Sequence, residues 1–165
     1  MSLTTDDQTA LRELLDAREI EQAFVRYFDR VDANDPEGAS QCFAQDVEFE
    51  IMTGKRKRGR DSFARSLGRV LDQYERTSHH VGNITSQIDG DSADVLAYVY
   101  AYHRMHNTGE PWHLWARMKD KFERIDGRWQ ITEHVLLGLD AVPNRPDIPR
   151  DWYPGHPGRL NRDSN

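Results

Sequence analysis

Two adjacent histidines, His79 and His80, begin a strand-like segment that follows, well along the chain, a helical segment ending near Asp32. Imidazole is the side chain that most readily gains and loses a proton near neutral pH. A carboxylate bonded to one ring nitrogen holds a single tautomer and leaves the other nitrogen to act as a general base. A helix-end Asp32 aimed at a strand histidine would therefore form a His–Asp general base.

The helical segment that would carry Asp32 is predicted to start at a cap formed by Thr5 or Asp6 and to end near Ala33. Its apolar residues recur at helical spacing: Ile20, Phe24, Tyr27, Phe28 and Val31. Tyr27 lies on one edge of this stripe and Asp32 on the other, so both can point into a cavity above a sheet. The alternative is that Tyr27 is a core aromatic and Asp32 an ordinary helix-end carboxylate.

The two histidines point to opposite faces of a regular strand, because neighbouring side chains alternate. His80 is in phase with Ile84 and Ile88, which favours His80 as the inward residue. His79 points inward only if the strand is interrupted, for instance by a bulge near Gly82. One of the two is therefore a pocket candidate and the other a solvent or interface residue.

The hydrophobic period changes from helical to strand-like near residue 78, which predicts an α+β domain. A short helix follows Pro36 and ends near Phe43, a strand covers residues 47–52, a polar loop covers 53–59, and a third helix starts near Asp61. Four strands then form a meander over residues 79–88, 93–106, 112–125 and 129–139. Residues 143–165, with five of the seven prolines, are predicted to be an extended tail anchored by Trp152 and Tyr153.

Composition excludes several classes of function. The 165 residues suffice for about one domain, and 28 acidic against 22 basic residues give a net charge of -6. That balance argues against nucleic acid or an anionic membrane as the main partner. The single Cys42 excludes an intramolecular disulfide. The N-terminus has no signal-like segment and no stretch resembles a membrane span, so we expect a cytoplasmic protein.

Cofactor chemistry has no support in the sequence. Phosphate-binding glycine loops, nucleophile elbows and nicotinamide or flavin fingerprints are absent. No pair of histidines has the compact spacing of a zinc site, so no metal is predicted. The basic run at residues 55–60 has no aromatic residues between its charges, and we interpret it as a solvated or subunit-contacting loop.

Five motifs occur in order: Arg26-Tyr27-Phe28 with Asp32, Phe43-Ala44-Gln45-Asp46-Val47, His79 with Gly82 and Asn83, Asp89-Gly90-Asp91-Ser92-Ala93, and a segment from Glu123 to Ile131. In this combination the chain resembles the SnoaL-like branch of the nuclear transport factor 2-like superfamily over most of its length. The resemblance implies a cone-shaped barrel of curved antiparallel sheet with three N-terminal-half helices on its concave face. Residues 1–142 would form this domain and residues 143–165 the tail.

In dehydratase and dehydrochlorinase members of that superfamily, a helix Tyr or Lys and an Asp accompany a catalytic His. The resemblance therefore implies a catalytic set of His79, Asp32 and Tyr27, with His79 favoured over His80. It implies a cofactor-independent, dehydratase-like lyase or isomerase that removes a proton from a hydrophobic cyclic small molecule. Because the same fold also serves proteins without chemistry, two alternatives stay open. These are a non-catalytic small-molecule-binding protein and an accessory subunit of the ring-hydroxylating oxygenase type.

The walls of the predicted pocket are drawn from aromatic and polar residues of the helix and the sheet. In scytalone dehydratase a second strand histidine lines the pocket, which suggests His103. The predicted substrate-binding residues are His103, Trp115, Phe28, Phe49, Arg117 and His80. An outer sheet face bearing Trp112, Trp115 and Tyr100 or Tyr102 would leave an apolar patch in water, which predicts a homodimer or homotrimer.

Overall fold

The computed structural model describes residues 4–51 and 55–142. Its elements are α1 (Thr5–Asp32), α2 (Pro36–Ser40), β1 (Phe43–Glu50), β2 (Lys57–Arg58), α3 (Arg60–Leu71), β3 (Tyr74–Asp89), β4 (Ser92–Met105), β5 (Pro111–Ile125) and β6 (Arg128–Val142). The predicted succession of helices and strands is confirmed, with the short β2 as an addition. The predicted tail, with Trp152 and Tyr153, lies outside the described residues.

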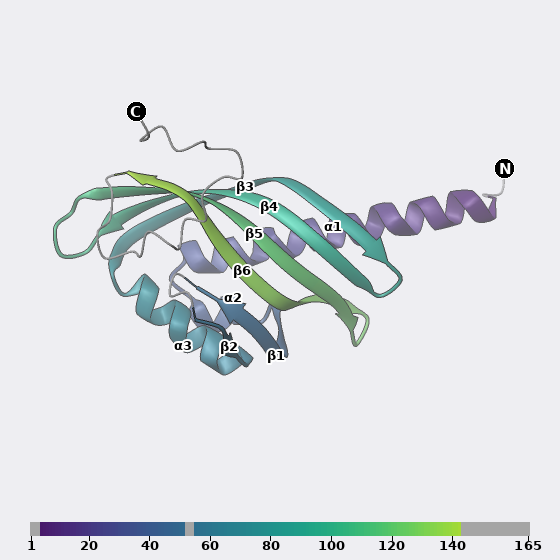
Figure 1. Ribbon diagram of the computed structural model, residues 1–165, viewed down its shortest axis with the longest axis horizontal. Helices are drawn as coiled ribbons and strands as arrows, with labels where there is room; N and C mark the ends of the chain where they lie inside the picture. Colours follow the sequence, from purple (N-terminus) through teal and green to yellow (C-terminus); the bar gives the residue numbers. More distant parts are fainter. Residues whose placement is uncertain (1–3, 52–54, 143–165) are drawn as a thin grey trace, which may run out of the picture.

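The N-cap of α1 is Thr4, one residue before Thr5, the first of the two predicted caps. Thr4 Oγ1 accepts a hydrogen bond from the backbone N–H of Asp7 at 3.1 Å, and the Asp7 carboxylate accepts one from the backbone N–H of Thr4 at 2.9 Å. This reciprocal capping box satisfies two backbone donors. Residues 5–15 are exposed and project beyond the sheet (Figure 1), and α1 has a buried face only from Asp16 onward. The second half of α1 is therefore the part that can place site residues.

All six strands form one sheet in the order β2-β1-β6-β5-β4-β3. Strands β3 to β6 are the predicted antiparallel meander. Strand β1 pairs with β6 in parallel, so the sheet is mixed rather than wholly antiparallel. The sheet curls without closing, and the three helices lie on its concave side (Figure 1). The α+β cone is thus confirmed as an open, mixed sheet.

The core fills the space between the concave face and the helices. The inward residues of β4 and β5 are almost all apolar: Ala93, Val95, Ala97, Val99 and Ala101 on β4, and Trp112, Leu114, Ala116, Met118 and Phe122 on β5. Strand alternation explains the pattern. Trp112 is only 1% exposed, so its predicted place on the outer face is wrong.

An irregularity in β3 decides which histidine faces the core. The register with β4 shifts between Gly82 and Thr85, and Asn83 has φ of 49°, a left-handed conformation that asparagine tolerates better than most residues. Ile84 packs against the core, as expected, but the extra residue places His79 in the same phase. The interruption that the sequence required for an inward His79 is therefore present.

The turn between β5 and β6 is fastened to α1 by a buried carboxylate. Asp16 accepts hydrogen bonds from Arg124 at 2.6 Å and from the indole N–H of Trp129 at 3.3 Å. The Arg124 guanidinium also stacks over the Trp129 ring, 4.6 Å from its centroid. This contact fixes the angle at which α1 crosses the sheet, and with it the position of Tyr27 and Asp32.

The basic run pairs with acidic neighbours. Arg56 contacts Glu133 at 3.0 Å, Arg58 contacts Asp46 at 2.9 Å, and Arg60 donates to the backbone carbonyl of Phe43 at 2.8 Å. These side chains hold the segment before α3 against β1 and β6. The side chains of Arg56 and Arg58 are exposed, as expected for a solvated segment, whereas Arg60 is half-buried at the first position of α3.

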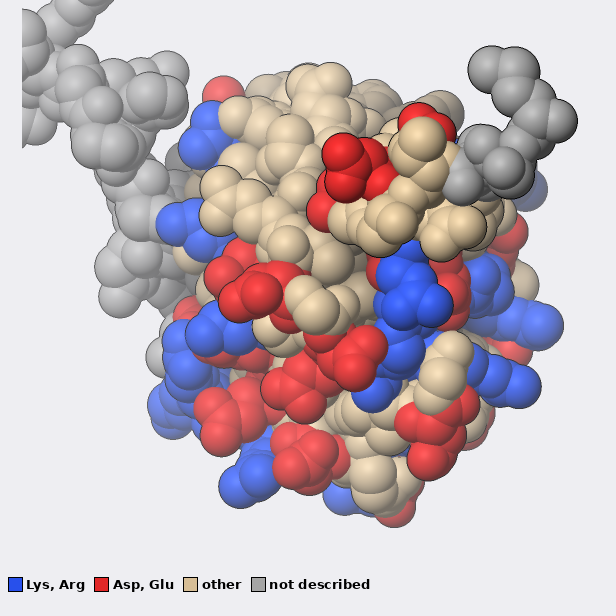
Figure 2. Space-filling model, turned by 90° about the vertical axis from the view of Figure 1, so that its right-hand side faces the viewer, with Lys and Arg blue, Asp and Glu red and all other residues tan. Residues whose placement is uncertain are grey.

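No helix in the described ranges combines the length and the apolar composition needed to cross a bilayer. Figure 2 shows the end of the molecule from which α1 projects, where acidic and basic side chains are interspersed. A face of mixed sign offers no continuous basic surface to a polyanion.

Candidate active site

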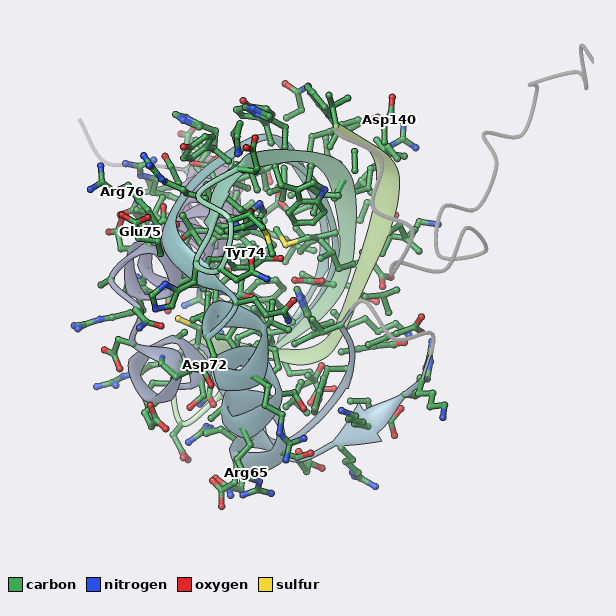
Figure 3. All side chains as sticks on the ribbon, turned by 90° about the vertical axis from the view of Figure 1, so that its left-hand side faces the viewer. Arg65, Asp72, Tyr74, Glu75, Arg76 and Asp140 are labelled. Atoms are coloured by element: carbon green, nitrogen blue, oxygen red, sulfur yellow. The ribbon has the colours of Figure 1, made fainter. Side chains whose placement is uncertain are left out.

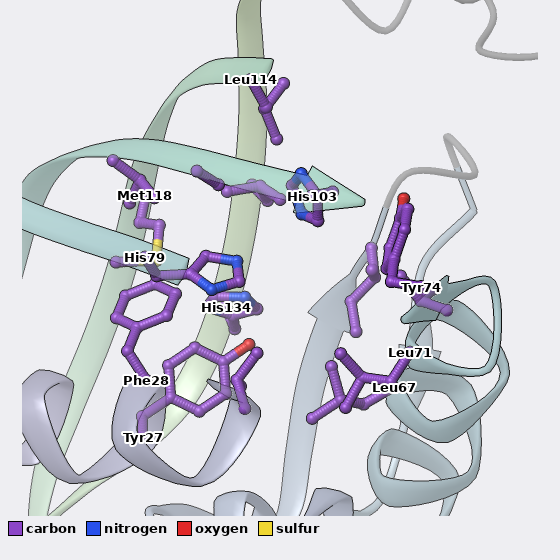
Figure 4. Close-up of a pocket in the computed structure, with 16 residues that line it drawn as sticks. Tyr27, Phe28, Leu67, Leu71, Tyr74, His79, His103, Leu114, Met118 and His134 are labelled. Carbon is purple, nitrogen blue, oxygen red and sulfur yellow. The ribbon is translucent and has the colours of Figure 1, made fainter. Parts of the chain in front are cut away.

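A narrow cavity lies between the concave face of the sheet and helices α1 and α3. Its volume is about 60 Å³, and most of its wall is apolar. The polar side chains that reach it are those of Tyr27, Tyr74, His79, His103 and His134 (Figure 4). An apolar cavity with a few convergent polar groups is the usual form of a small-molecule site.

The cavity extends toward the end of the cone where α3 meets β3. Leu71 and Tyr74 line it there. In Figure 3, which looks at this end, Tyr74 points between the helix and the curled sheet, whereas Glu75 and Arg76 point outward. The cavity is much smaller than the ~300–1,000 Å³ of typical ligand sites. A ring-sized molecule can therefore enter only if side chains at this end move apart.

The Asp32 carboxylate binds His79 by two routes. Asp32 Oδ1 lies 2.6 Å from His79 Nδ1, and Asp32 Oδ2 accepts the backbone N–H of His79 at 2.8 Å. The hydroxyl of Thr77 donates to Asp32 Oδ1 at 2.7 Å. Because Nδ1 is engaged, the ring nitrogen left for a ligand is Nε2. The bidentate contact also fixes the backbone of β3 against the end of α1.

The environment keeps Asp32 charged. Its partial burial favours the neutral acid, but the hydrogen bonds from His79 and Thr77 outweigh this effect and hold the pKa of the Asp32 carboxyl below its ordinary value. A charged carboxylate at Nδ1 stabilises the imidazolium that forms when Nε2 takes up a proton. The pair therefore has the arrangement that general-base chemistry needs.

Tyr27 and Phe28 occupy the floor of the cavity. The Phe28 ring stacks on His79 with centroids 4.8 Å apart and fixes the plane of the imidazole. Burial, assisted by the negative charge of Asp120, raises the pKa of the Tyr27 hydroxyl well above its ordinary range. The Tyr27 hydroxyl therefore stays protonated and is a hydrogen-bond donor.

His103 lies on the cavity wall, as predicted. It is 5% exposed, meets the His79 ring edge-on at 5.4 Å between centroids, and packs between Tyr74 and Trp112. The structure thus brings the side chains of Tyr27, Phe28, His79 and His103 together around one cavity.

Three predicted pocket residues lie elsewhere. His80, Trp115 and Arg117 belong to the outward phase of β3 and β5, and predicting them as pocket residues was wrong. His80 is exposed because the β3 irregularity places its neighbour inward. Trp115 is 41% exposed and packs on Tyr100, and the Arg117 guanidinium stacks over and hydrogen-bonds to Tyr98.

Phe49 is a core residue behind the cavity. It is 2% exposed and meets the Phe63 ring edge-on at 5.2 Å. Strand alternation turns Phe49 inward in β1, where it packs against Phe63 of α3. Its assignment to the substrate-binding wall is corrected to a supporting position in the core, since it does not line the cavity.

A second His–Asp pair lies at the same cavity: His134 lines it, and Asp120 holds the His134 ring. The sequence did not identify this pair. Both carboxylate oxygens of Asp120 lie 3.0 Å from His134 Nδ1, and both residues are buried. A signal was available, because Asp120 falls in the inward phase of β5 between Met118 and Phe122. A carboxylate in an apolar phase is rarely buried without a partner.

No three histidine, cysteine or acidic side chains among residues 4–51 and 55–142 cluster in a metal-binding arrangement. The lone Cys42 lies in neither His–Asp pair.

A sequence model of the SnoaL-like domain matches residues 12–135, well over half of the chain. The protein therefore belongs to the SnoaL-like family, and the resemblance drawn from its motifs is confirmed. None of the curated proteins matches the sequence.

Several solved structures have the same fold. A candidate scytalone dehydratase from Novosphingobium aromaticivorans DSM 12444 is 25% identical with a TM-score of 0.75, and the match covers 81% of this chain and 90% of that chain. The LinA-type3 hexachlorocyclohexane dehydrochlorinase from Novosphingobium barchaimii LL02 is 16% identical with a TM-score of 0.73, covering 83% and 95%. The second likeness shows the fold alone.

Proposed function

We propose that the protein is a cofactor-independent lyase of the dehydratase type that acts on a small hydrophobic ring compound. The distance of 2.6 Å between Asp32 Oδ1 and His79 Nδ1, beside an apolar cavity that His79 lines, carries this proposal. Membership of the SnoaL-like family and the fold shared with a candidate scytalone dehydratase and a dehydrochlorinase support it.

In the proposed reaction His79 Nε2 removes a proton from a carbon atom next to an activating group. Asp32 holds the imidazole in one tautomer and stabilises the imidazolium, and Tyr27 donates a hydrogen bond to a substrate oxygen. The electron pair of the broken C–H bond forms a double bond as the leaving group departs. The apolar wall strengthens each of these interactions, because charges in it are poorly screened.

A protein that only binds small molecules is the main alternative. Such a protein would need an apolar cavity but no charged carboxylate within hydrogen-bond reach of a cavity histidine. The contact between Asp32 and His79, together with the lowered pKa of Asp32, favours the catalytic interpretation. The accessory-subunit alternative has no comparable feature in the described residues.

The proposal can be tested before the natural substrate is known, with nitrobenzisoxazole as a probe. A base removes the ring C–H, the N–O bond breaks, and a coloured cyanophenolate forms, which is the elimination step in a small apolar ring. We expect turnover of this probe by the wild-type protein, and a loss of about 10²-fold or more in His79→Ala, the range typical of a general base. Turnover that is equal in both proteins would refute the proposal.

A further inference from the structure

The His134–Asp120 pair crosses from β6 to β5, where the two residues are register partners. The Asp120 side chain is 0% exposed and the His134 side chain 2%. His134 Nδ1 lies 3.0 Å from both carboxylate oxygens of Asp120, so the two oxygens contact this ring nitrogen equally. A carboxylate in this position orients the ring and stabilises its protonated form.

Packing does not require this pair. The rings of Tyr27, Phe43 and Phe63 surround His134, with centroids 5.5 to 5.9 Å away and interplanar angles of 71° to 87°. Apolar residues of similar volume would fill such a site, and replacing a buried ion pair in that way is often neutral or stabilising. The pair is therefore better explained by chemistry in the cavity than by the stability of the core.

The free nitrogen of His134 is available to the cavity. Asp120 occupies Nδ1, and no group in the described part of the chain bonds Nε2. His134 lines the cavity that His79 also lines (Figure 4). Strands β4 and β5 separate the two histidines in the sheet, and its curl turns both inward. The cavity thus has two carboxylate-supported imidazoles, where general-base chemistry needs one.

We infer that His134 is the general acid of the elimination and Asp120 its positioning residue, so the substrate class is a ring compound whose leaving group is a hydroxyl. This inference rests on the proposed function. A hydroxide ion is a poor leaving group and needs a proton as it departs, whereas a halide does not. Loss of water therefore calls for a proton donor at the leaving oxygen, a role that the second imidazole can fill and that loss of a halide does not require.

The proton balance closes within the site. His79 Nε2 takes the proton of the C–H bond, and the electron pair of that bond forms the C=C bond. The C–O bond breaks, and its oxygen takes the proton of His134 Nε2 and leaves as water. His79 is then protonated and His134 neutral, and exchange with solvent returns each ring to its starting state. No oxidant, reductant or co-reactant is consumed.

The test uses two probes on the full-length protein, benzisoxazole and nitrobenzisoxazole, which differ in how well the phenolate leaves. We expect His134→Gln to reduce kcat/KM on the order of 100-fold for the poor leaving group, within the range of general-acid effects. The loss for the nitro probe should be several times smaller. Asp120→Asn should change the ratio of the two rates in the same direction. His80→Gln, an exposed histidine outside the site, is the matched control and should leave the ratio unchanged.

The ratio of the rates on the two probes does not depend on how much of a variant is folded. A partly unfolded His134→Gln variant therefore still tests the role of His134. An equal loss on both probes in His134→Gln and Asp120→Asn, with His79→Ala inactive, would overturn this inference and leave the proposed function intact. Absence of turnover by the wild type, or turnover independent of His79, would overturn both.

Discussion

The two faces of the sheet are built from the same strands and carry different chemistry. On the concave face His79, His103 and His134 are held among apolar side chains, two of them by carboxylates. On the convex face His80 and His113 are exposed or half-buried among aromatic residues. His79 and His80 are sequence neighbours, so residue type alone does not separate a candidate base from a surface residue.

A comparison of His113 with His79 shows which surroundings favour a histidine as a general base. His113 also has a partner, the Tyr100 hydroxyl at 2.7 Å from its Nδ1, but that partner carries no charge. His79 has a charged carboxylate and a stacked phenyl ring, and it borders an enclosed space. A charged partner in a poorly screened environment stabilises the imidazolium most.

The largest effect is expected from His79→Ala compared with His80→Ala. Loss of His79 should lower turnover of nitrobenzisoxazole by about 10²- to 10⁴-fold, because it removes the base itself. Loss of His80 should change it less than about twofold, since surface substitutions rarely disturb a site. Initial rates and melting temperatures of both variants measure this. An inactive His80→Ala beside an active His79→Ala would reverse the assignment of faces.

Tyr27→Phe should reduce turnover by about 10- to 100-fold, the usual value of a hydrogen bond to a charged group. The raised pKa of Tyr27 keeps its hydroxyl protonated at working pH. Removing the hydroxyl should therefore lower the rate without moving the alkaline side of the pH–rate profile. A shifted alkaline limb would mean that Tyr27 titrates during the reaction. Tyr102→Phe, a partly buried tyrosine on the other face, is the matched control.

Trp115 should affect assembly rather than turnover. We propose that the outer face forms the contact between subunits of a homodimer or homotrimer, because Trp115 and Leu139 are 41% and 40% exposed beside other aromatic residues. Trp115→Ser should shift the mass from an oligomer toward 19.2 kDa, measured by light scattering at micromolar concentration. If the wild-type protein is itself a monomer, the proposal that the outer face forms a subunit contact is contradicted.

The smallest effect is expected on the stability of Asp32→Asn and on how that stability changes at acid pH. The pKa of Asp32 is lowered in the folded protein, so its charge contributes stability above its unfolded pKa of about 3.9, and this contribution is lost as the pH falls toward the folded pKa. The free energy of unfolding of the wild type should therefore exceed that of Asp32→Asn most above about pH 5, and this excess should shrink as the pH falls below the unfolded pKa toward the lowered folded pKa. Urea unfolding across this range measures the difference. Thr77→Val, which removes one of the hydrogen bonds to Asp32, should give a smaller change of the same sign. A difference independent of pH would show that Asp32 stabilises the fold by shape alone.

Local patterns in the chain were sufficient for the fold and for half of the site. The switch in hydrophobic period predicted the order of helices and strands, and the motifs identified the family. The helix stripe placed Tyr27 and Phe28 toward the cavity, whereas the choice of His79 over His80 and its pairing with Asp32 came from the family resemblance, against the regular strand phase. The parallel pairing of β1 with β6 could not be predicted, because strands far apart in the chain leave no local signal of their pairing.

The sequence by itself determined which side chains could do chemistry, since residue type and periodicity are local properties of the chain. Only the tertiary structure decided which of them meet. One extra residue near Asn83 selected His79 over His80, since it reverses the strand phase that Ile84 indicates. The register between β5 and β6 brought Asp120 to His134, and the curl of the sheet placed His134 in the wall of the cavity that His79 also lines. These are long-range relations, fixed by backbone pairing and twist rather than by the composition of any one segment.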